Sequence, residues 1–564
     1  MIIDKTVSIS IAALLLCCGF MAITAGAESS QLAADDMTLG TDDPVIMGAM
    51  RLGTYHQDIF NAVAATSDGY YVAVGESGSS EPFAYDGDFE DVTYAGQKPA
   101  VIVKFSDAGD IIWKKVLTFP LNLTRFTAVV ATDDGGFVAV GYSSSVGSVM
   151  YPIVNSMSFW DPIIIKYDVD GNVEWMNGLS GKGAAYFHGV TATSDGGFVA
   201  VGHAAADAWD TGWYGFDGVL GKGKDDGLIV KFDAAGNRVW VKSFGGAGTD
   251  QLSSVVETSD GGLIAVGRIQ KESKGTGDII GYLGGGNGTQ NGLIVKFDSA
   301  GNSLWIKCFG DRLDYFTDVS LTSDDCVIVV GHAPLYANST NAGDWAGFVA
   351  PSSGYFGIIV KYDNDGNLMW KKAVGGTNND YFNGVTETAS GFIAVGYSTA
   401  SSLGTGDWEG LVGMGDYDAT IVNFDFDGNI TWTASFGGDG DDTLLGVTST
   451  SDGDPVAVGY SAAESFNTGG WEGIAGRGLK DAIILKYGGW EASALGDGGG
   501  SGGSSGTGSG TDGYLMYMIF AIVLMAGSIV AMAAGGKVIG IVLLVGGFVF
   551  FAQAELIDII GAVT

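Results

Sequence analysis

Basic residues are scarce in this chain. It has 27 Lys and Arg against 64 Asp and Glu, which gives a formal net charge of −37 over 564 residues. Recognition of nucleic-acid phosphates needs basic patches, so this deficit argues against nucleic acid as a partner. A surface this acidic repels copies of itself, as is common for proteins displayed outside the cell.

Histidine, cysteine and proline are also scarce, with four, four and nine residues. None of His56, His188, His203 and His332 lies in a metal-binding spacing such as His-Glu-x-x-His. No Gly-x-Ser-x-Gly elbow or phosphate-binding loop occurs in a strand–turn–helix setting. We therefore expect a protein that is not an enzyme and requires no cofactor.

The two ends of the chain differ from its middle. Residues 1–27 combine Lys5, an apolar stretch and the small residues Ala25-Gly26-Ala27, which predicts a cleaved signal peptide followed by a lead of residues 28–44. The alternative is an uncleaved anchor. At the other end, residues 491–513 are a Gly/Ser-rich linker.

Two apolar segments after the linker predict a membrane anchor. Residues 514–534 carry no charge and are long enough to span a bilayer as a helix, and residues 538–554 predict a second, shorter transmembrane helix. A tail of residues 555–564 follows. With Lys537 in a cytoplasmic turn, this hairpin would hold the preceding domain outside the plasma membrane, at the cell surface.

Glycine is abundant, at 93 residues, and hydrophobic residues make up 46 %, which together predict short strands and tight turns. One unit is repeated: the segment Val-Ala-Val-Gly, or a close variant, recurs every 61 to 66 residues. Each unit has four strand-like runs, which we name a, b, c and d, with hairpin turns between a and b and between c and d. Four short strands per repeat predict a β-propeller blade. The seven copies end at Gly75, Gly141, Gly202, Gly267, Gly331, Gly396 and Gly459.

The offset of the repeats supports an all-β, seven-bladed propeller over residues 45–490. The first six repeats end in a d strand with a Trp, whereas the seventh stops after its c strand. Residues 45–53 align with the missing strand. The N-terminal strand is therefore predicted to complete the last blade and remove the free edges.

The pattern Ile-Val-Lys-Phe-Asp-x-x-Gly-Asn-x-x-Trp-x-Lys-x-x-Gly-Gly, over about residues 45–487, resembles the seven-bladed β-propeller repeats of bacterial and archaeal cell-surface proteins. The resemblance implies the fold but no particular activity, because propellers host many functions. Part of the pattern, Asp-x-x-Gly-Asn-x-x-Trp, also resembles the tryptophan-docking motif of quinone-dependent alcohol dehydrogenases. The longer repeat counts against that kinship.

Strand direction assigns the loops to two faces. The long, variable b–c loops and the d–a turns share one face, which we call the top face, and the a–b and c–d hairpins share the bottom face. The last c strand ends at the bottom, so the linker leaves there and the top face points away from the membrane. Variable loops on a rigid scaffold are where partners are expected.

Three sets of top-face residues are candidate sites. The first is a Trp motif in the b–c loops, in which a Trp beside a polar group stacks on a sugar or, alternatively, forms the loop's own core. The second is a ring of carboxylates at the start of the a strands, which either holds calcium or accepts amide hydrogen bonds within the d–a turns. The third is a rim at the top end of the b strands, with ordinary strand ends as the alternative.

The first set comprises Trp213, Trp345, Trp408, Glu409, Trp471 and Glu472. The carboxylate ring comprises Asp58, Asp250, Asp314, Asp380 and Asp442. The rim comprises Glu76, Tyr142, His203, Arg268, His332, Tyr397 and Tyr460.

Two further motifs lie in loops and turns. The segments at 168–172, 363–367 and 425–429 look like shortened calcium loops, but they lack the Glu at the twelfth position and predict plain hairpin turns. N-glycosylation sequons, which would make the protein a glycoprotein, begin at Asn122, Asn287, Asn338 and Asn429.

These features predict a membrane-anchored extracellular module for binding or adhesion, whose top face engages a glycan, an envelope polymer or another surface protein. One alternative is a structural envelope component that packs laterally with its neighbours. Another is a propeller enzyme, either a polysaccharide lyase or a quinone-type oxidoreductase, with its site at the central funnel.

Overall fold

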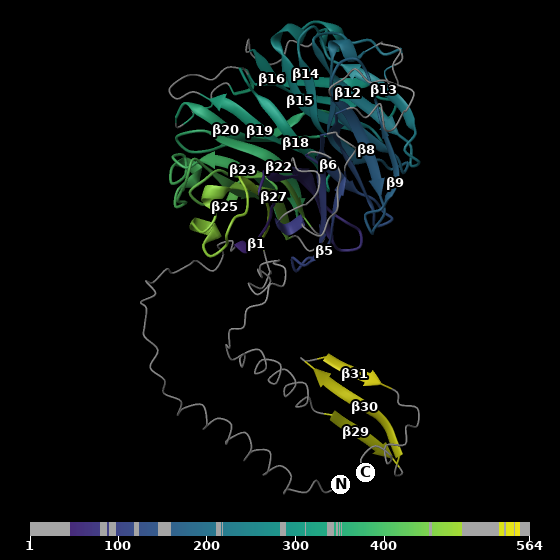
Figure 1. The fold of residues 1–564 in the computed structure, drawn as a ribbon, viewed down its shortest axis with the longest axis vertical. Helices are drawn as coiled ribbons and strands as arrows, with labels where there is room; N and C mark the ends of the chain where they lie inside the picture. Colours follow the sequence, from purple (N-terminus) through teal and green to yellow (C-terminus); the bar gives the residue numbers. More distant parts are fainter. Residues whose placement is uncertain are drawn as a thin grey trace. The chain divides into compact units, whose positions relative to one another are not determined.

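The computed structural model contains seven four-stranded antiparallel sheets (Figure 1), whose inner strands line a central channel. The chain divides into two units, Met1–Asp497 and Gly498–Thr564. In the first unit the structure describes residues 46–78, 87–89, 98–117, 123–144, 160–209, 216, 218–281, 289–310, 312–335, 343–345, 348, 350, 352–449 and 454–487. In the second it describes the backbone of residues 529–534, 537–545 and 548–552.

Six blades each consist of four consecutive strands, ordered from the channel outward. Blade 1 is β2 (Asp58–Ala65), β3 (Tyr71–Ser77), β4 (Ala100–Phe105) and β5 (Ile111–Leu117). Blade 2 is β6 (Thr124–Ala131), β7 (Phe137–Ser143), β8 (Asp161–Tyr167) and β9 (Val173–Gly178). Blade 3 is β10 (Ala185–Ala192), β11 (Phe198–Ala205), β12 (Asp225–Phe232) and β13 (Arg238–Phe244).

The next three blades repeat this order. Blade 4 is β14 (Asp250–Glu257), β15 (Leu263–Gln270), β16 (Gln290–Phe297) and β17 (Ser303–Phe309). Blade 5 is β18 (Tyr315–Leu321), β19 (Val327–Leu335), β20 (Gly354–Tyr362) and β21 (Leu368–Val374). Blade 6 is β22 (Asp380–Thr388), β23 (Gly391–Thr399), β24 (Tyr417–Phe424) and β25 (Ile430–Phe436).

Blade 7 joins the two ends of the propeller. It contains β26 (Asp442–Ser449), β27 (Pro455–Ala462), β28 (Lys480–Tyr487) and, as its outer strand, β1 (Ile46–Leu52). β1 pairs antiparallel with β28 and places Leu52 opposite Ala482, as Phe244 lies opposite Gly227 in blade 3. The prediction of a seven-bladed propeller closed by its N-terminal strand is confirmed.

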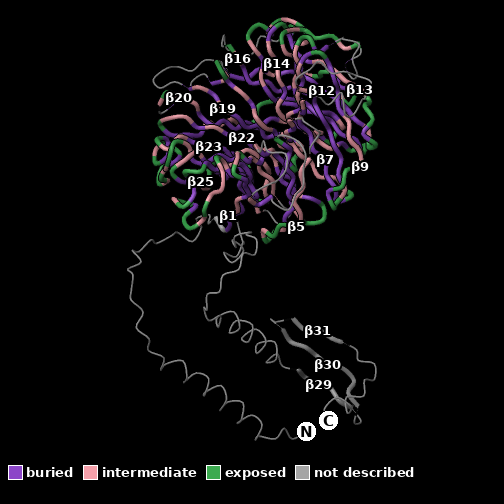
Figure 2. The backbone as a smooth tube through the Cα atoms, viewed as in Figure 1, coloured by how far each residue is buried: buried purple, intermediate pink, exposed green. Residues whose placement is uncertain are grey.

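The core lies between blades rather than within them. Strands b and c are buried along their length on both faces, as their continuous apolar runs predict (Figure 2). Each apolar cluster is shared by two adjacent blades; one of them joins Val63 and Phe105 of blade 1 to Val456 and Ile484 of blade 7. Every blade therefore depends on both neighbours to cover its faces.

A tryptophan on the outer strand of a blade packs against the c–d turn of the next blade. Trp175, for example, donates its indole N–H to the carbonyl of Ala234, and its ring lies against Gly236. Gly236 has φ +78°, and a Cβ at this position would lie 2.5 Å from the indole. Turn conformation and close packing therefore both require glycine here.

On the bottom face, a buried lysine of strand c binds an aspartate of its own a–b turn in most blades. In blade 5, Lys361 Nζ lies 2.8 Å from Asp324 Oδ2, and the lysine side chain is 5 % exposed. Blade 6 lacks both members, because Ser390 and Asn423 stand at the corresponding positions. The lysine and the aspartate are expected to be lost together, since a buried ammonium without its carboxylate is strongly unfavourable.

The second unit differs from the sequence expectation. Residues 529–552 form a three-stranded antiparallel sheet of β29 (Ile529–Ala534), β30 (Lys537–Val545) and β31 (Phe548–Ala552), where two transmembrane helices were predicted. That expectation rested on length and hydrophobicity, and the Val, Ile and Phe residues of these runs also favour strands. Within the described part of the chain, no helix has the length and apolar character to cross a membrane.

The predicted signal peptide, the lead, the linker, residues 514–528 of the first apolar segment and the C-terminal tail lie outside the described residues. Cys308 and Cys326 are both free and buried.

The lysine–aspartate pair yields a test of fold stability. We expect Asp324→Ser to destabilise the protein by about 2–4 kcal/mol, because it leaves the ammonium of Lys361 buried and uncompensated. The double variant Asp324→Ser/Lys361→Asn reproduces the blade 6 pair, and we expect it to recover most of the loss. Denaturation midpoints of the full chain measure both effects; a double variant as unstable as the single one would contradict this account.

Candidate functional site

A cavity of about 330 Å³ lies between the inner strands. Each inner strand has a β-bulge, for instance between Phe60 and Ala62 in β2, and the extra residue faces this cavity. Six of the seven bulge residues are polar, so the channel is hydrophilic at this level. The bulge residues are Asn61, Thr127, His188, Ser253, Thr317, Asn383 and Leu445.

Most bulge residues also connect neighbouring blades. Asn61 Nδ2 donates to the carbonyl of Phe126 at 2.7 Å, and Asn383 Nδ2 donates to the carbonyl of Leu444 at 2.7 Å. These carbonyls lie at the bulge of the next blade, where the strand ladder is interrupted. His188 breaks the series, because its Nε2 pairs with His203 Nδ1 at 2.8 Å instead.

In each blade, the inner-strand residue two positions before the bulge residue pairs with one of the rim residues predicted from the sequence. We call these paired residues, together with Tyr355, Tyr417 and Lys480 beside them, the collar. It occupies the top end of the channel, and all of its members but Thr443 are half-buried. The pairs are Ile59 and Glu76, Arg125 and Tyr142, Tyr186 and His203, Gln251 and Arg268, Tyr315 and His332, Tyr381 and Tyr397, and Thr443 and Tyr460.

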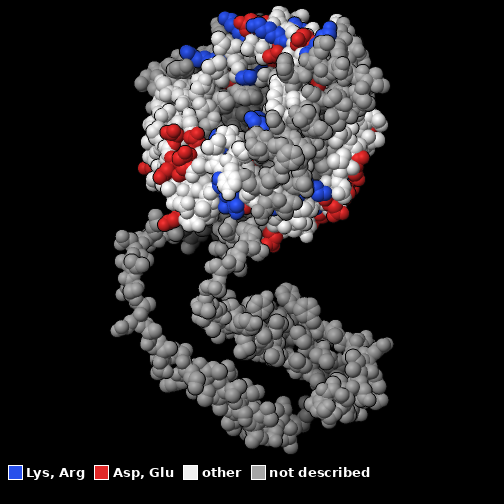
Figure 3. All heavy atoms as spheres, viewed as in Figure 1, with Lys and Arg blue, Asp and Glu red and all other residues white. Residues whose placement is uncertain are grey.

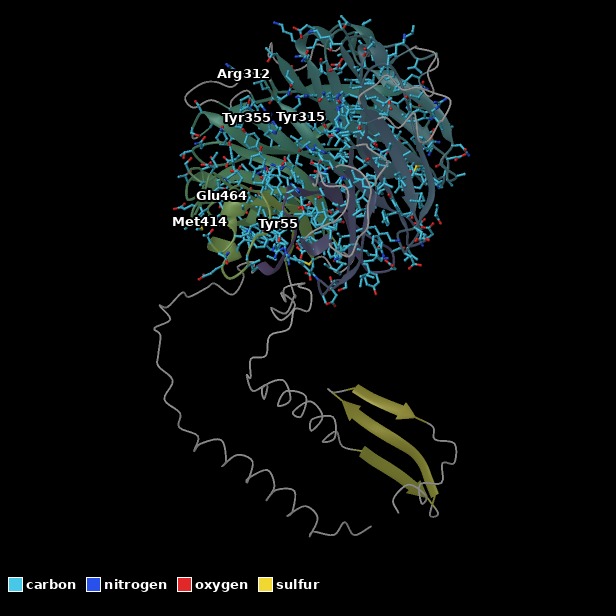
Figure 4. The ribbon with its side chains drawn as sticks, in the orientation of Figure 1. Tyr55, Arg312, Tyr315, Tyr355, Met414 and Glu464 are labelled. Carbon is cyan, nitrogen blue, oxygen red and sulfur yellow. The ribbon has the colours of Figure 1, made fainter. Side chains whose placement is uncertain are left out.

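The structure therefore joins the rim residues into one surface and adds to it a second set of residues from the inner strands. The inner-strand half was missed in the sequence, although its signal was present: each member directly follows the position of the predicted carboxylate ring. Tyr315 and Tyr355 both lie on the viewed face of blade 5 (Figure 4) and both contact His332.

Aromatic rings pack edge to face and face to face around much of the collar. In blades 5 and 6, His332 contacts Tyr381 at a centroid distance of 5.0 Å, and Tyr381 stacks on Tyr397 at 4.7 Å. In blades 2 and 3, Tyr142 contacts Tyr186 at 4.8 Å, and Tyr186 stacks on His203 at 4.8 Å. Since these rings cover part of one another's faces, much of what remains for a ligand is ring edges.

Three cations interrupt the aromatic rings. Arg125 forms an ion pair with Glu76. Lys480 lies over the ring of Tyr460 with its Nζ 3.7 Å from the centroid. Arg268 lies over Tyr315 at 5.0 Å.

The collar is therefore more basic than the chain as a whole. A few basic side chains lie near the centre of the face shown in Figure 3 and others along its upper edge, while acidic side chains gather mainly at its sides.

The three histidines near Arg268 are uncharged at neutral pH. Burial, and after it the charge of Arg268, lowers the pKa of His188 to about 4 and that of His332 to about 4. Burial, then the neighbouring His188 and Arg268, lowers the pKa of His203 to about 3.

The Trp motif belongs to the loop cores. Trp345, Trp408 and Trp471 end the short 3₁₀ helices η5 (Gly343–Trp345), η6 (Gly406–Trp408) and η8 (Gly469–Trp471), and their side chains are at most 2 % exposed. Their faces are covered by protein, so these rings do not stack on a sugar, and the loop-core interpretation holds. Glu409 and Glu472 beside them are exposed, and Trp213 lies outside the described residues.

The carboxylate ring and the Trp motif are parts of one structure. Asp380 accepts hydrogen bonds from the amide of Gly376 at 3.0 Å, from Ser402 Oγ at 2.9 Å and from Trp408 Nε1 at 2.8 Å. This carboxylate therefore ties its d–a turn to a b–c loop, and its amide hydrogen bonds agree with the turn interpretation. The same indole contact joins Trp345 to Asp314 and Trp471 to Asp442, while Asp58 and Asp250 accept amide hydrogen bonds of their own turns.

A metal at these carboxylates has no support in the geometry. Among the residues that the structure describes, no group of three or more His, Cys, Asp or Glu is arranged to hold a metal ion. In the three c–d turns that look like calcium loops, the aspartate is engaged within the turn: Asp168 accepts from the amides of Asp170 and Asn172 and from Asn172 Nδ2. This favours the hairpin interpretation for Asp168, Asp363 and Asp425, which share the pattern.

Asn429, the one sequon asparagine within the described residues, is exposed in the c–d turn of blade 6, and its side-chain amide donates to Asp425. Asn122, Asn287 and Asn338 lie outside that part of the chain.

Some blade junctions hold two buried carboxylates. Asp418, at the start of strand c in blade 6, is 2 % exposed and lies beside Asp442 of blade 7, which is fully buried. Burial raises the pKa of Asp418 to about 7; the amide of Met414 opposes this rise and the charge of Asp442 adds to it. Asp226 and Asp250 form a similar pair between blades 3 and 4, where burial raises the pKa of Asp250 to about 6.

No family model matches this chain, and no curated protein matches it. Solved structures resemble it at low identity. The Pan2 WD40 domain of Neurospora crassa is 9 % identical, with 79 % of this chain and 97 % of that chain covered and a TM-score of 0.38. Quinohemoprotein alcohol dehydrogenase ADHIIG of Pseudomonas putida HK5 is 12 % identical, with coverages of 84 % and 81 % and a TM-score of 0.32. Drosophila Plexin A, in complex with Semaphorin 1b, is 8 % identical, with coverages of 79 % and 87 % and a TM-score of 0.34. None of these similarities carries an argument about function.

The paired carboxylates predict how one substitution depends on pH. The folded pKa of Asp418 lies above the unfolded value, so its contribution to stability is full at low pH and is lost as pH rises through about 7. We expect Asp418→Asn to be more stable than the parent at pH 8, by on the order of 2 kcal/mol, and to lose most of that advantage at pH 5, which lies between the unfolded and folded pKa values.

Melting of the full chain at the two pH values measures this difference, with the exposed Asp427→Asn as the matched control. Equal effects of Asp418→Asn at pH 5 and pH 8 would show that the carboxyl carries no unusual proton affinity.

Proposed function

We propose that the chain is a non-catalytic binding module of the cell surface, whose collar holds a glycan at the mouth of the central channel. The single observation that carries the proposal is the collar itself. Tyrosines from five blades converge on one opening, and the hydroxyls of Tyr186, Tyr381 and Tyr397 form no hydrogen bond within the described part of the chain. Converging hydroxyls and apolar ring edges suit a ligand rich in hydroxyl groups and C–H surfaces.

Binding rather than catalysis is favoured by the carboxylates. Glycosidase chemistry uses two carboxyl groups that flank the reacting bond. The described cavity lining contains one, Asp318, which is engaged with the amide of Val385 at 3.0 Å. Glu76, the carboxylate of the collar itself, is paired with Arg125, and the ring carboxylates next to the collar are buried in turn hydrogen bonds.

Display at the cell surface is part of the proposal. The N-terminal apolar stretch with its small-residue site supports export. The hydrophobicity of the segments after the linker supports retention at the plasma membrane, although β29, β30 and β31 are strands rather than the predicted helices. In this arrangement the top face, and with it the collar, is turned toward the surroundings. Lateral packing in an envelope would not require open hydroxyls at the channel mouth.

The proposal is tested by measuring glycan binding to the full chain on an array of matched neutral and acidic glycans. We expect Tyr381→Phe and Tyr397→Phe to weaken binding about three- to tenfold each, because each removes one hydroxyl and keeps the stacked ring. Tyr70→Phe makes the same change on the bottom face and is expected to leave binding unchanged. Absence of binding to every glycan, or equal loss in all three variants, would overturn the proposal.

A further inference from the structure

We infer that the collar recognises a single carboxylate group, as borne by a terminal acidic sugar, and that Arg268 is the residue that binds it. This inference rests on the proposed function and names the chemical class of its ligand. It is carried by the unmatched charge of Arg268 at the channel mouth.

Arg268 has no acidic partner among the described residues. Its guanidinium donates from Nε and Nη2 to Gln251 Oε1, at 2.9 and 2.6 Å, and from Nη1 to Gln290 Oε1 at 3.2 Å. Both acceptors are neutral amides, so the positive charge remains uncompensated. In a chain with 64 acidic and 27 basic residues, a half-buried arginine without a carboxylate is an exception that an anionic ligand would explain.

The same contacts leave the arginine ready to bind. A guanidinium has five N–H donors, and three are used, so two remain. Gln251, Gln290 and the ring of Tyr315 fix the group, which lowers the conformational entropy lost on binding. Two N–H groups in one plane match the two oxygens of a carboxylate better than a single point charge would.

The neighbouring groups leave this positive charge in place. His188, His203 and His332 are neutral near pH 7, as shown above, and so neither compensate nor add charge. Asp318 belongs to the channel wall below the collar, and Asp225 lies near Tyr186 in blade 3. Neither carboxylate forms an ion pair with Arg268.

The aromatic rings next to Arg268 also favour an anion. One face of Tyr315 is covered by the guanidinium, and Tyr381 and Tyr397 each cover one face of the other. What they offer a ligand is ring edges and hydroxyl donors, and the edge of an aromatic ring carries partial positive charge.

The charge of the whole protein limits the ligand to few charges. A net charge of −37 repels a long polyanion, and this repulsion is strongest at low ionic strength. A ligand with a single terminal carboxylate is attracted by Arg268 and, because it carries only one charge, is repelled much less by the rest of the protein. The same repulsion opposes non-specific binding of anions to the protein surface, so an anion that binds is expected to bind at a specific site.

The test uses the full chain and three probes: glucuronate, glucose and glucose 6-sulfate. Binding is followed by calorimetry and by the imidazole NMR signals of His188, His203 and His332, which lie within the influence of Arg268. We expect glucuronate to bind and to raise the pKa of these histidines by offsetting the arginine charge, while glucose binds at least tenfold more weakly. Arg268→Gln is expected to weaken glucuronate binding about 10- to 100-fold, the equivalent of one charged hydrogen-bonded pair.

Matched variants separate this outcome from loss of structure. Arg238→Gln removes an exposed arginine of the outer strand β13 and is expected to bind glucuronate like the parent. In the ligand-free protein, Arg268→Gln should raise the pKa of the three histidines, which shows that the variant is folded and that the arginine charge acts there.

Each remaining outcome is decisive. Equal binding of glucose and glucuronate, or unchanged glucuronate binding in Arg268→Gln, overturns the inference while the glycan proposal stands. Stronger binding of the sulfate than of the carboxylate overturns the carboxylate assignment. If no acidic glycan of the array binds but neutral ones do, the inference alone fails, and if no glycan binds at all, both fail.

Discussion

Burial of both faces of every sheet is the constraint on which this molecule depends. The b and c strands are apolar on both sides, and each apolar cluster is assembled from two adjacent blades. A blade alone would expose one or two large apolar surfaces, so the blades are stable only as a closed ring. The pairing of β1 with β28 is therefore essential to the fold, because it completes blade 7, which packs against blade 1 and buries its apolar face.

Closure is reinforced by three kinds of contact that recur between the blades. Near the axis, bulge residues such as Asn61 and Asn383 satisfy carbonyls of the next blade. At the top end of the inner strands, carboxylates such as Asp380 tie the d–a turn to a b–c loop through an indole N–H. At the outside, the d-strand tryptophans pack on the glycine of the next c–d turn. These groups are repeated because each junction presents the same backbone atoms, which need a hydrogen-bond partner. Burial of the carboxylates at the junctions raises their pKa values.

The rigid ring converts seven variable positions into one surface. Strand b and the inner strand each contribute one residue per blade at the same height, so sequence differences among the repeats become differences around the collar. Arg268 stands out there because its blade offers two glutamines where blade 1 supplies a carboxylate, Glu76, to Arg125. The net negative charge of the chain repels anions in general, so the unpaired guanidinium of Arg268 is a local point of attraction.

Much of the architecture was determined by the sequence alone. The regular return of Val-Ala-Val-Gly, the turn residues and the displaced last strand specify the blades and their closure, since strand periodicity and turn chemistry are local properties. The rim from Glu76 to Tyr460 could also be located, because its members follow a fixed landmark in each repeat.

Only the tertiary structure decided what these residues do. It placed Trp408 and Trp471 inside the loops, because their indoles find buried carboxylates some 28 and 29 residues away in the chain. It also brought the inner-strand residues Tyr381 and Gln251 against the rim, which no local pattern specifies. Whether Arg268 has a charged partner depends on which side chains the ring places around it, and that is a property of the closed structure rather than of any one repeat.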